Sequence, residues 1–254
     1  MRFQDKVAVI TAGGAGIGKA TAEIMVREGA TVIVIDVDVA RLEAMADALA
    51  SAPGKLVTKM LDATDKALVR GSVGEIAATH GHIDILVNAV GGSTIIASPG
   101  AKVDELSFED WQKLIDFNLN ATYLWCNNVV PLMRQAGYGK IVNLSSIAGR
   151  GLAGASSSAY AAAKGGIIAF TKHLSIELGP SGINVNAIAP SITLTERIRP
   201  HWEKRSAEQQ AVEIKRTPLR RLAEAEDQAR VIAFLASQDA DFVTGLTIDV
   251  TGGV

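Results

Sequence analysis

Short apolar runs rich in β-branched residues alternate with longer stretches of helical periodicity along the whole chain. The apolar runs predict seven strands, at residues 7–10, 31–35, 56–57, 83–87, 141–144, 183–188 and 246–250. The periodic stretches predict helices at 17–28, 40–50, 65–79, 108–136, 158–178 and 225–237. Because the strands are apolar throughout rather than alternating, both faces of their sheet should be covered. The pattern therefore predicts a doubly wound (Rossmann) α/β fold, with a mostly parallel seven-stranded sheet and helices on both faces.

The domain organisation follows from what interrupts this rhythm. No linker rich in Gly, Ser or Pro and no internal repeat divides the 254 residues. We therefore expect residues 1–254 to form a single domain, with an insertion at about 191–222 that covers one end of the sheet. A (β/α)₈ barrel also alternates strands and helices over about this length, and the first strand–loop–helix unit has to decide between the two.

Composition and charge narrow the class of protein. With 48% hydrophobic residues the chain is globular, and a formal net charge of −2 argues against a nucleic-acid partner. No apolar run reaches the ~18 residues that span a bilayer, and no signal peptide is apparent, so we expect a cytoplasmic protein without a membrane partner. Cys126, the single cysteine, lies among apolar residues and is interpreted as part of the core. The four histidines lack ligand spacing, so we expect no metal site.

A glycine-rich turn separates the first strand from the first helix, between Thr11 and Gly18. Backbone N–H groups of such a turn and the N-terminus of the following helix can bind a pyrophosphate. Glycine-rich turns also occur for steric reasons alone. The next strand ends in Asp36, 20 residues after Gly16, where a carboxylate binds ribose hydroxyls and repels a 2′-phosphate. The turn contains no Arg or Lys, so NAD is favoured over NADP, although a solvated Asp at a strand end is the simpler alternative.

These motifs, together with Asn88-Ala89-Val90-Gly91 and Tyr160-Ala161-Ala162-Ala163-Lys164, resemble those of the short-chain dehydrogenase/reductase family. The resemblance covers essentially the whole chain in the family's order. It implies a set of cofactor-binding residues: Gly13, Gly16, Ile17, Gly18, Asp36, Asp62, Ala63, Asn88, Tyr160, Lys164, Thr193 and Thr195. Asp62 and Ala63 would hold the adenine, the backbone of Asn88 would follow the adenosine ribose, and Thr193 and Thr195 would hold the nicotinamide carboxamide. The sequence departs from the family at Ala12, Ala89-Val90, Ser191 and Thr251, which puts local turn geometry in question.

The catalytic candidates are Asn118, Ser146, Tyr160 and Lys164. Tyr160 and Lys164 are four residues apart in a helical stretch, so they share a face, and an adjacent ammonium lowers the pKa of a phenol that must act as a base. The resemblance implies that Ser146 polarises the substrate oxygen, with Ser145 as the alternative, and that Lys164 holds the nicotinamide ribose. It also implies that Asn118 supports a water that relays protons through Lys164. Ser146 and Tyr160 are 14 residues apart, one more than expected, which predicts an extra residue in the loop between them.

The expected function is hydride transfer between NAD(H) and a secondary alcohol or ketone. The alternatives are a 3-oxoacyl-thioester reductase, which Asp36 disfavours because such reductases usually take NADPH, and a non-catalytic NAD-binding sensor. The C-terminal strand at 246–250 should be a sheet edge that pairs on assembly, and similar proteins form tetramers, so we expect a homotetramer.

The insertion is strongly basic. Residues 194–221 contain eight Lys and Arg against four Glu, a local balance of +4 in a chain of net charge −2. One interpretation is a solvated helical face. The other is a lid that closes over bound cofactor and offers Arg197 or Arg199, which lie nearest Thr195, to an anionic substrate.

Overall fold

The structure, a computed structural model, describes residues 1–152 and 156–254. Within these residues the main sheet has seven strands in the order β3-β2-β1-β4-β5-β6-β9, and every neighbouring pair is parallel. The strands are β1 (Val7–Thr11), β2 (Thr31–Asp36), β3 (Lys55–Met60), β4 (Ile85–Asn88), β5 (Gly139–Leu144), β6 (Ile183–Pro190) and β9 (Thr247–Val250). The sheet is open, with edges at β3 and β9, so the doubly wound prediction is confirmed and the barrel is excluded.

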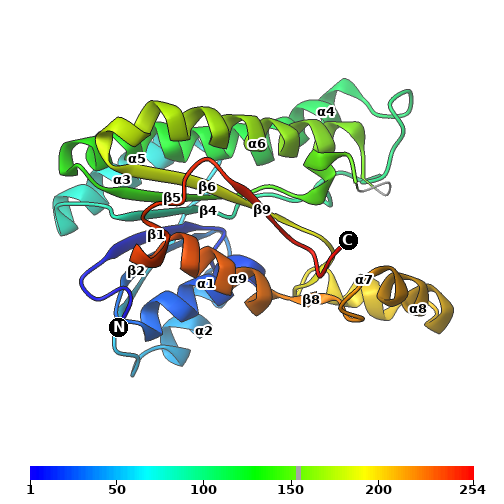
Figure 1. Cartoon of the computed structure of the whole chain (residues 1–254), viewed down its shortest axis with the longest axis horizontal. Coiled ribbons are helices and arrows are strands. Elements are labelled where there is room, and N and C mark those ends of the chain that lie inside the picture. Colours follow the sequence, from blue (N-terminus) through cyan, green and yellow to red (C-terminus); the bar gives the residue numbers. More distant parts are fainter. Residues whose placement is uncertain (153–155) are drawn as a thin grey trace.

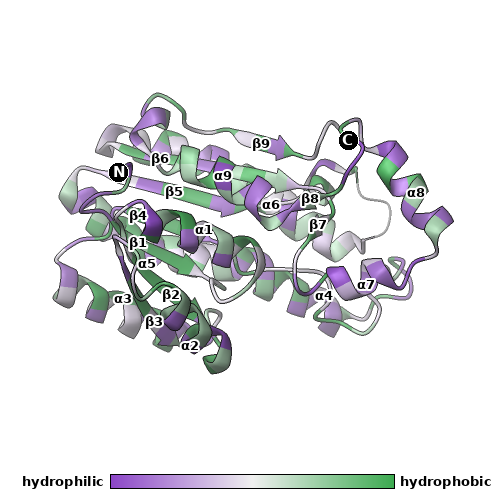
Figure 2. Cartoon of the chain, turned by 90° about the horizontal axis from the view of Figure 1, so that it is seen from below, coloured by the Kyte–Doolittle hydropathy of each residue, from purple (hydrophilic) through white to green (hydrophobic). Residues whose placement is uncertain are grey.

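Helices cover both faces of this sheet (Figure 1). One layer contains α1 (Gly16–Arg27), α2 (Val39–Ala48) and α9 (Ala225–Leu235). The opposite layer contains α3 (Lys66–His80), α5 (Ala121–Ala136) and α6 (Ser158–Leu178). Successive residues of β1 pack into the hydrophobic cores on opposite faces of the sheet. Val9 packs on the side of α3 and α5, whereas Ala8 and Ile10 pack on the side of α1. This two-sided burial is why β1, β2 and β4 are hydrophobic along most of their length (Figure 2).

Two regions differ from the elements that the sequence predicts. The single helix expected at 108–136 consists of α4 (Phe108–Ile115), a π-helical turn (Asp116–Asn120) and α5. The charged insertion contains elements that the sequence pattern does not assign: β7 (Thr193–Leu194), α7 (Arg199–Glu203), α8 (Ala207–Arg216) and β8 (Ala223–Glu224).

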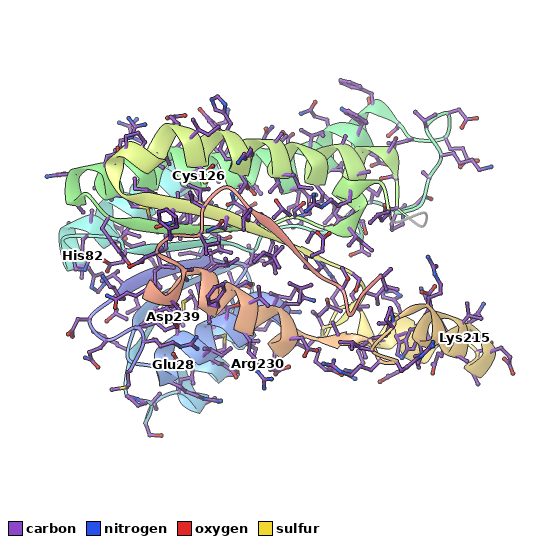
Figure 3. The ribbon with its side chains drawn as sticks, in the orientation of Figure 1. Glu28, His82, Cys126, Lys215, Arg230 and Asp239 are labelled. Atoms are coloured by element: carbon purple, nitrogen blue, oxygen red, sulfur yellow. The ribbon has the colours of Figure 1, made fainter. Side chains whose placement is uncertain are left out.

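The two helices of this inserted segment project away from the main sheet (Figure 1). Strand β7 pairs with β8 in a separate two-stranded sheet, whereas α7 and α8 contain no buried residue and project beyond the sheet (Figure 1). Lys215, near the end of α8, lies far from the main sheet (Figure 3). No helix in the described part of the chain is long and apolar enough to cross a membrane.

The strand order places the site. The chain runs outward from β1 to β2 and β3, then returns to β4 on the other side of β1, so two loops diverge at the carboxyl ends of β1 and β4. Ligands of open parallel sheets bind in the crevice at such a reversal. Thr11 at the end of β1 stands in register with Asn88 at the end of β4, and both lead into segments that the sequence predicts to bind a cofactor.

Candidate active site

Thr11 fixes the two loops that leave the centre of the sheet. Its hydroxyl is completely buried and accepts hydrogen bonds from the backbone N–H groups of Ala89 (3.0 Å) and Val90 (3.2 Å). The loop after β4 is thereby attached to the start of the glycine turn after β1. A small hydroxyl side chain at position 11 is therefore what keeps the two loops at a defined separation.

The glycine turn brings α1 close to β1. A Cβ atom on Gly18 would lie 2.5 Å from the carbonyl oxygen of Ala12, so only glycine permits this approach. Gly16, the first residue of α1, has φ of +56°, a left-handed conformation that glycine adopts without strain. Ala12 has φ of +48° where the resembled family has glycine, so this departure keeps the turn geometry at the cost of some backbone strain.

The N-terminus of α1 is contacted by a carboxylate. Ala15, which precedes the helix, provides no side-chain cap, and the N–H of Gly16 instead donates to Oε2 of Glu196 over 2.8 Å. Lys19 lies 3.9 Å from the other oxygen of Glu196. A helix N-terminus binds anions, so Glu196 stands where a pyrophosphate is expected. Nothing in the sequence indicates this contact apart from the position of Glu196 beside Thr195.

Asp36 faces the same turn from the end of β2. Its side chain is nearly buried, and Oδ2 accepts from the N–H of Gly14 (2.9 Å) while Oδ1 accepts from the N–H of Asp38 (3.1 Å). Asp36 is thus held in place rather than solvated. Asp38 has a different task, because it caps α2 by accepting from the N–H of Arg41.

A pocket lies beside Asp36 where the resemblance places the adenine. Its lining residues are Ala12, Ile35, Asp36, Val37, Leu61, Asp62, Ala63, Thr64, Val90 and Phe117. The carboxylate of Asp62 accepts from the N–H and the hydroxyl of Thr64, which shapes the loop after β3. The fully buried indole of Trp125 donates to the carbonyl oxygen of Ala63 over 3.0 Å and ties that loop to α5.

Tyr160 and Lys164 lie one helical turn apart on α6. The ammonium nitrogen of Lys164 is 5.8 Å from the centre of the Tyr160 ring and donates to the carbonyl oxygen of Leu144 over 2.7 Å. Leu144 is the last residue of β5, so the lysine connects α6 to the carboxyl edge of the sheet. The side chain of Ser157 caps α6 by accepting from the N–H of Tyr160, which fixes the first turn of that helix.

The two candidate serines face different groups. The Ser146 hydroxyl lies beside the Tyr160 phenol and acts to lower its pKa, and its oxygen accepts from the N–H of Ala148 over 3.1 Å. Ser145 is buried and donates to the carbonyl oxygen of Lys164 over 2.8 Å. Ser146 therefore lies beside the phenol and Ser145 braces the helix. The extra residue expected in the loop before Tyr160 cannot be located, because residues 153–155 lie outside the described residues.

Burial is the largest influence on the pKa values of Tyr160 and Lys164. It raises the pKa of the Tyr160 phenol, against the opposing effects of the Ser146 hydrogen bond and the positive charge of Arg197. Burial, with a smaller contribution from Arg197, also lowers the pKa of Lys164 to about 7. The pKa of Tyr160 is thus shifted upwards in this structure, opposite to the direction expected from Lys164 alone, because desolvation outweighs the nearby positive charge.

Asn118 occupies the centre of the π-helical turn and is fully buried. Its side chain accepts from the N–H of Gly92 (2.9 Å) and donates to the carbonyl oxygens of Gly92 (3.2 Å) and Leu114 (2.9 Å). A Cβ atom on Gly91 would lie 2.7 Å from both Oδ1 of Asn118 and the nitrogen of Lys164. The turn at Gly91 and Gly92 therefore packs directly against Asn118 and Lys164.

Asn88, at the end of β4, belongs to a buried network of polar side chains. Asn88 directs its side chain into the core, where it donates to Asn143 (2.9 Å) and to the sulfur of Cys126 (3.3 Å). Asn143 in turn donates to the hydroxyl of Thr171 over 2.9 Å, a buried chain of polar groups that the sequence analysis missed. Burial raises the pKa of Cys126 to about 12, in keeping with its position in the helical layer (Figure 3).

Thr193 lies in β7 and Thr195 directly follows that strand. Buried Thr193 donates to the carbonyl oxygen of Ser191 over 3.2 Å and accepts from Gln228 over 3.3 Å. The methyl group of Thr195 lies 3.0 Å from where a Cβ of Gly16 would stand. The structure thus places Thr195 against the glycine turn and Thr193 against Ser191 and Gln228. Among the described residues, no group of three or more His, Cys, Asp or Glu side chains could hold a metal ion.

A parallel sheet with a glycine turn, an acidic residue at the end of β2 and a Tyr–Lys–Ser cluster at its carboxyl edge defines a dinucleotide-binding oxidoreductase. A family model described as enoyl-(acyl carrier protein) reductase matches residues 11–254. The chain belongs to the short-chain dehydrogenase/reductase family, as its motifs indicated.

Individual relatives match over their whole length. Cis-4-hydroxycyclohexanecarboxylate dehydrogenase of Sinomonas cyclohexanicum is 38% identical, over 99% of this chain and 97% of the relative. A 3-oxoacyl-(acyl-carrier-protein) reductase of Thermotoga maritima is 36% identical, over 100% and 99%. The crystal structure of a 3-oxoacyl-(acyl-carrier protein) reductase with bound NAD from Brucella melitensis superposes with a TM-score of 0.87 at 34% identity, covering 100% of this chain and 94% of the other.

Proposed function

We propose that the protein is an NAD-dependent dehydrogenase of secondary alcohols, able to reduce the corresponding ketones, with oxidation as the physiological direction. The observation that carries the proposal is the placement of the Ser146 hydroxyl beside the Tyr160 phenol, with buried Lys164 near the phenol ring. An alcohol oxygen placed between the serine and tyrosine hydroxyls would meet a donor and a proton acceptor at once. That is the arrangement that alcohol oxidation requires.

The residues at the cofactor crevice fit a dinucleotide. The N–H groups of the glycine turn and of the first turn of α1 would hold the pyrophosphate, and Asp36 and Asp62 border the pocket expected for the adenosine. A bound nicotinamide would accept the hydride that leaves the alcohol carbon. Asp36 supports NAD, because its carboxylate stands beside the turn without an Arg or Lys to neutralise a 2′-phosphate.

Each catalytic candidate has a separate task in this proposal. Tyr160 accepts the proton of the alcohol, and Ser146 donates a hydrogen bond to the substrate oxygen. Lys164 supports the phenolate electrostatically, and Asn118 holds the turn at Gly91 and Gly92 against Lys164 and completes the proton relay. Thr193 and Thr195 line the nicotinamide side of the crevice. The segment 191–222 would act as the substrate lid of a single domain spanning residues 1–254.

The substrate class distinguishes this proposal from its main alternative. The relative from Sinomonas is named for a ring alcohol that carries a carboxylate, which supports a compact secondary alcohol as substrate. The solved relative from Brucella is a 3-oxoacyl reductase that binds NAD, so a 3-oxoacyl-thioester reductase remains the second candidate even with Asp36 in place. A non-catalytic NAD sensor is disfavoured, because Tyr160, Lys164 and Ser146 are all present. We further propose that the enzyme works in the cytoplasm as a homotetramer.

The test is steady-state kinetics with NAD and NADP on a panel of secondary alcohols, beginning with cyclohexanol and cis-4-hydroxycyclohexanecarboxylate, and with acetoacetyl thioesters in the reverse direction. We expect kcat/KM to favour NAD by at least ~10²-fold, which corresponds to about 2.7 kcal/mol. Asp36→Ala should narrow this preference. Equal use of NADP by the wild type would contradict the cofactor proposal, and turnover of thioesters alone would favour the reductase alternative.

A further inference from the structure

The basic residues of segment 194–221 differ in how they are paired. Four of them have a carboxylate within 4.0 Å: Arg199 with Glu224, Arg205 and Arg216 with Glu213, and Arg221 with Asp227. These ion pairs support the interpretation that most of the segment is a solvated surface, because the charges of these four arginines are balanced by nearby carboxylates. Arg199, one of the two arginines singled out in the sequence, is thereby tied to the base of the segment.

Arg197 is placed differently. Its guanidinium donates to the carbonyl oxygen of Gly91 over 3.2 Å, and no carboxylate among the described residues lies within salt-bridge distance of it. A Cβ atom on Gly92 would stand 2.5 Å from the same guanidinium. The arginine therefore lies against the turn whose other side contacts Asn118 and Lys164.

The position of Arg197 makes it part of the electrostatic environment of the catalytic groups. Its positive charge lowers the pKa of both Tyr160 and Lys164. A guanidinium with one hydrogen bond to a neutral carbonyl retains most of its five N–H donors for another ligand. An anion that binds beside Arg197 is attracted by its guanidinium and by the charged form of Lys164.

We propose that Arg197 binds a carboxylate of the substrate and so makes the enzyme selective for hydroxy acids. This inference rests on the proposed function, because it assigns the substrate of the same site. The planar guanidinium fork matches a carboxylate through two parallel hydrogen bonds. Binding there fixes one end of the substrate at the turn of Gly91 and Gly92 and leaves the alcohol carbon free to reach Ser146 and Tyr160.

The experiment compares one acid with its neutral counterpart. Effects of a substitution on folding or on the catalytic groups then cancel in the ratio of the two kcat/KM values. The probes are cis-4-hydroxycyclohexanecarboxylate and its methyl ester, with NAD, for the wild type, Arg197→Gln and the matched control Arg199→Gln. We expect the wild type to have a kcat/KM ratio of acid over ester above ~10, and Arg197→Gln to lower this ratio at least ~10-fold. Because Arg197 also influences Tyr160, only the ratio reports on recognition of the anion. Arg199→Gln should leave the ratio unchanged.

A binding measurement separates this inference from the proposed activity. Cyclohexanecarboxylate and cyclohexanecarboxamide are titrated into the protein with NADH, and the fluorescence of the bound reduced cofactor is followed. Preferential binding of the acid that Arg197→Gln abolishes supports the inference, even if neither alcohol is oxidised and the proposed activity fails. A wild type that binds acid and amide equally, or an Arg197→Gln variant with an unchanged ratio, overturns it.

Discussion

At the scale of single residues, the site works by placing hydroxyl groups of similar appearance in different roles. Ser145 and Ser146 are adjacent in sequence, yet Ser145 braces α6 through the carbonyl of Lys164, whereas Ser146 lies beside the Tyr160 phenol. The extended conformation around Ser146 turns consecutive side chains in opposite directions, as in any strand. Their chemical consequences should therefore be separable by substitution.

Tyr160→Phe removes the hydroxyl that accepts the proton and keeps the ring. We expect kcat to fall by roughly 10²–10⁴-fold, since general base catalysis contributes about this factor, with little change in the Kd for NAD. Ser146→Ala should be similarly damaging, because the substrate oxygen loses its donor. Ser145→Ala serves as the matched control and should be much milder. If the two serine variants ranked the other way, the assignment of Ser146 would be wrong.

Lys164 makes the stability of the cofactor-free protein dependent on pH. Its pKa is about 7 in the folded chain and near the ordinary value of 10.5 when unfolded. Between these values the unfolded state binds more protons, so the lysine's contribution to the free energy of unfolding increases as pH rises from 7 to 10.5. Below pH 7 the lysine is charged in both states and its burial penalty is fully present.

Lys164→Met removes this titration. The stability of the variant relative to the wild type should fall by up to about 1.4 kcal/mol per pH unit across this window, because one pKa unit corresponds to that free energy. Urea denaturation at pH 6, 8 and 9.5 measures the difference. Lys172→Met, at an exposed position on the same helix, should show a flat difference. A flat difference for Lys164→Met as well would mean that the lysine is not desolvated.

At the scale of elements, the sequence predicts most of the fold because burial and periodicity agree. The helix at 158–178 was predicted with the observed bounds, since its apolar face and its serine cap are both local signals. The sequence predicts one continuous helix at 108–136, because the segments before and after the π-helical turn are both α-helical and have the same apolar periodicity. Asn118, in the π-helical turn, accepts a hydrogen bond from Gly92, which is 26 residues away in the sequence. Local periodicity does not reveal a contact of this kind.

The inserted segment shows what local reasoning misses. Helices α7 and α8 bury nothing, so they lack the apolar stripe from which a helix is predicted, although Ser206 and Gln209 form a capping box at the start of α8. The site residues were predictable because motifs mark them in sequence. The contacts of Glu196 with Gly16 and of Arg197 with Gly91 were not, because they span 180 and 106 residues of chain.

At the scale of the whole molecule, large apolar side chains on α9 and in the segment that leads into β9 are exposed. Phe242 is fully exposed, and Leu246 and Phe234 are 50% and 36% exposed. Strand β9 pairs with β6 on one side only among the described residues, which leaves a free edge beside this apolar group. An apolar surface next to an open edge is suited to contact with a second copy of the chain.

Phe242→Asp should therefore weaken the proposed tetramer. A charge in the centre of an apolar contact is desolvated on assembly, so we expect dimers or monomers at micromolar concentration by light scattering. The control is Leu68→Asp, at an exposed position of α3 away from this edge, which should leave the mass of the assembly unchanged. Circular dichroism would verify that both variants are folded. A wild-type monomer would contradict the proposed assembly.

The carboxylate of Glu196 at the N-terminus of α1 should compete with the incoming cofactor. The N–H of Gly16 cannot serve Glu196 and a diphosphate at once, so the arriving dinucleotide has to displace this carboxylate. Cofactor entry should consequently be slower than it would be without Glu196. Glu196→Ala should raise the association rate of NADH in stopped-flow measurements and tighten its Kd about three- to tenfold, since one such hydrogen bond contributes about 1 kcal/mol. Glu203→Ala on α7 should change neither quantity, and an unaltered rate in Glu196→Ala would mean that the carboxylate does not gate entry.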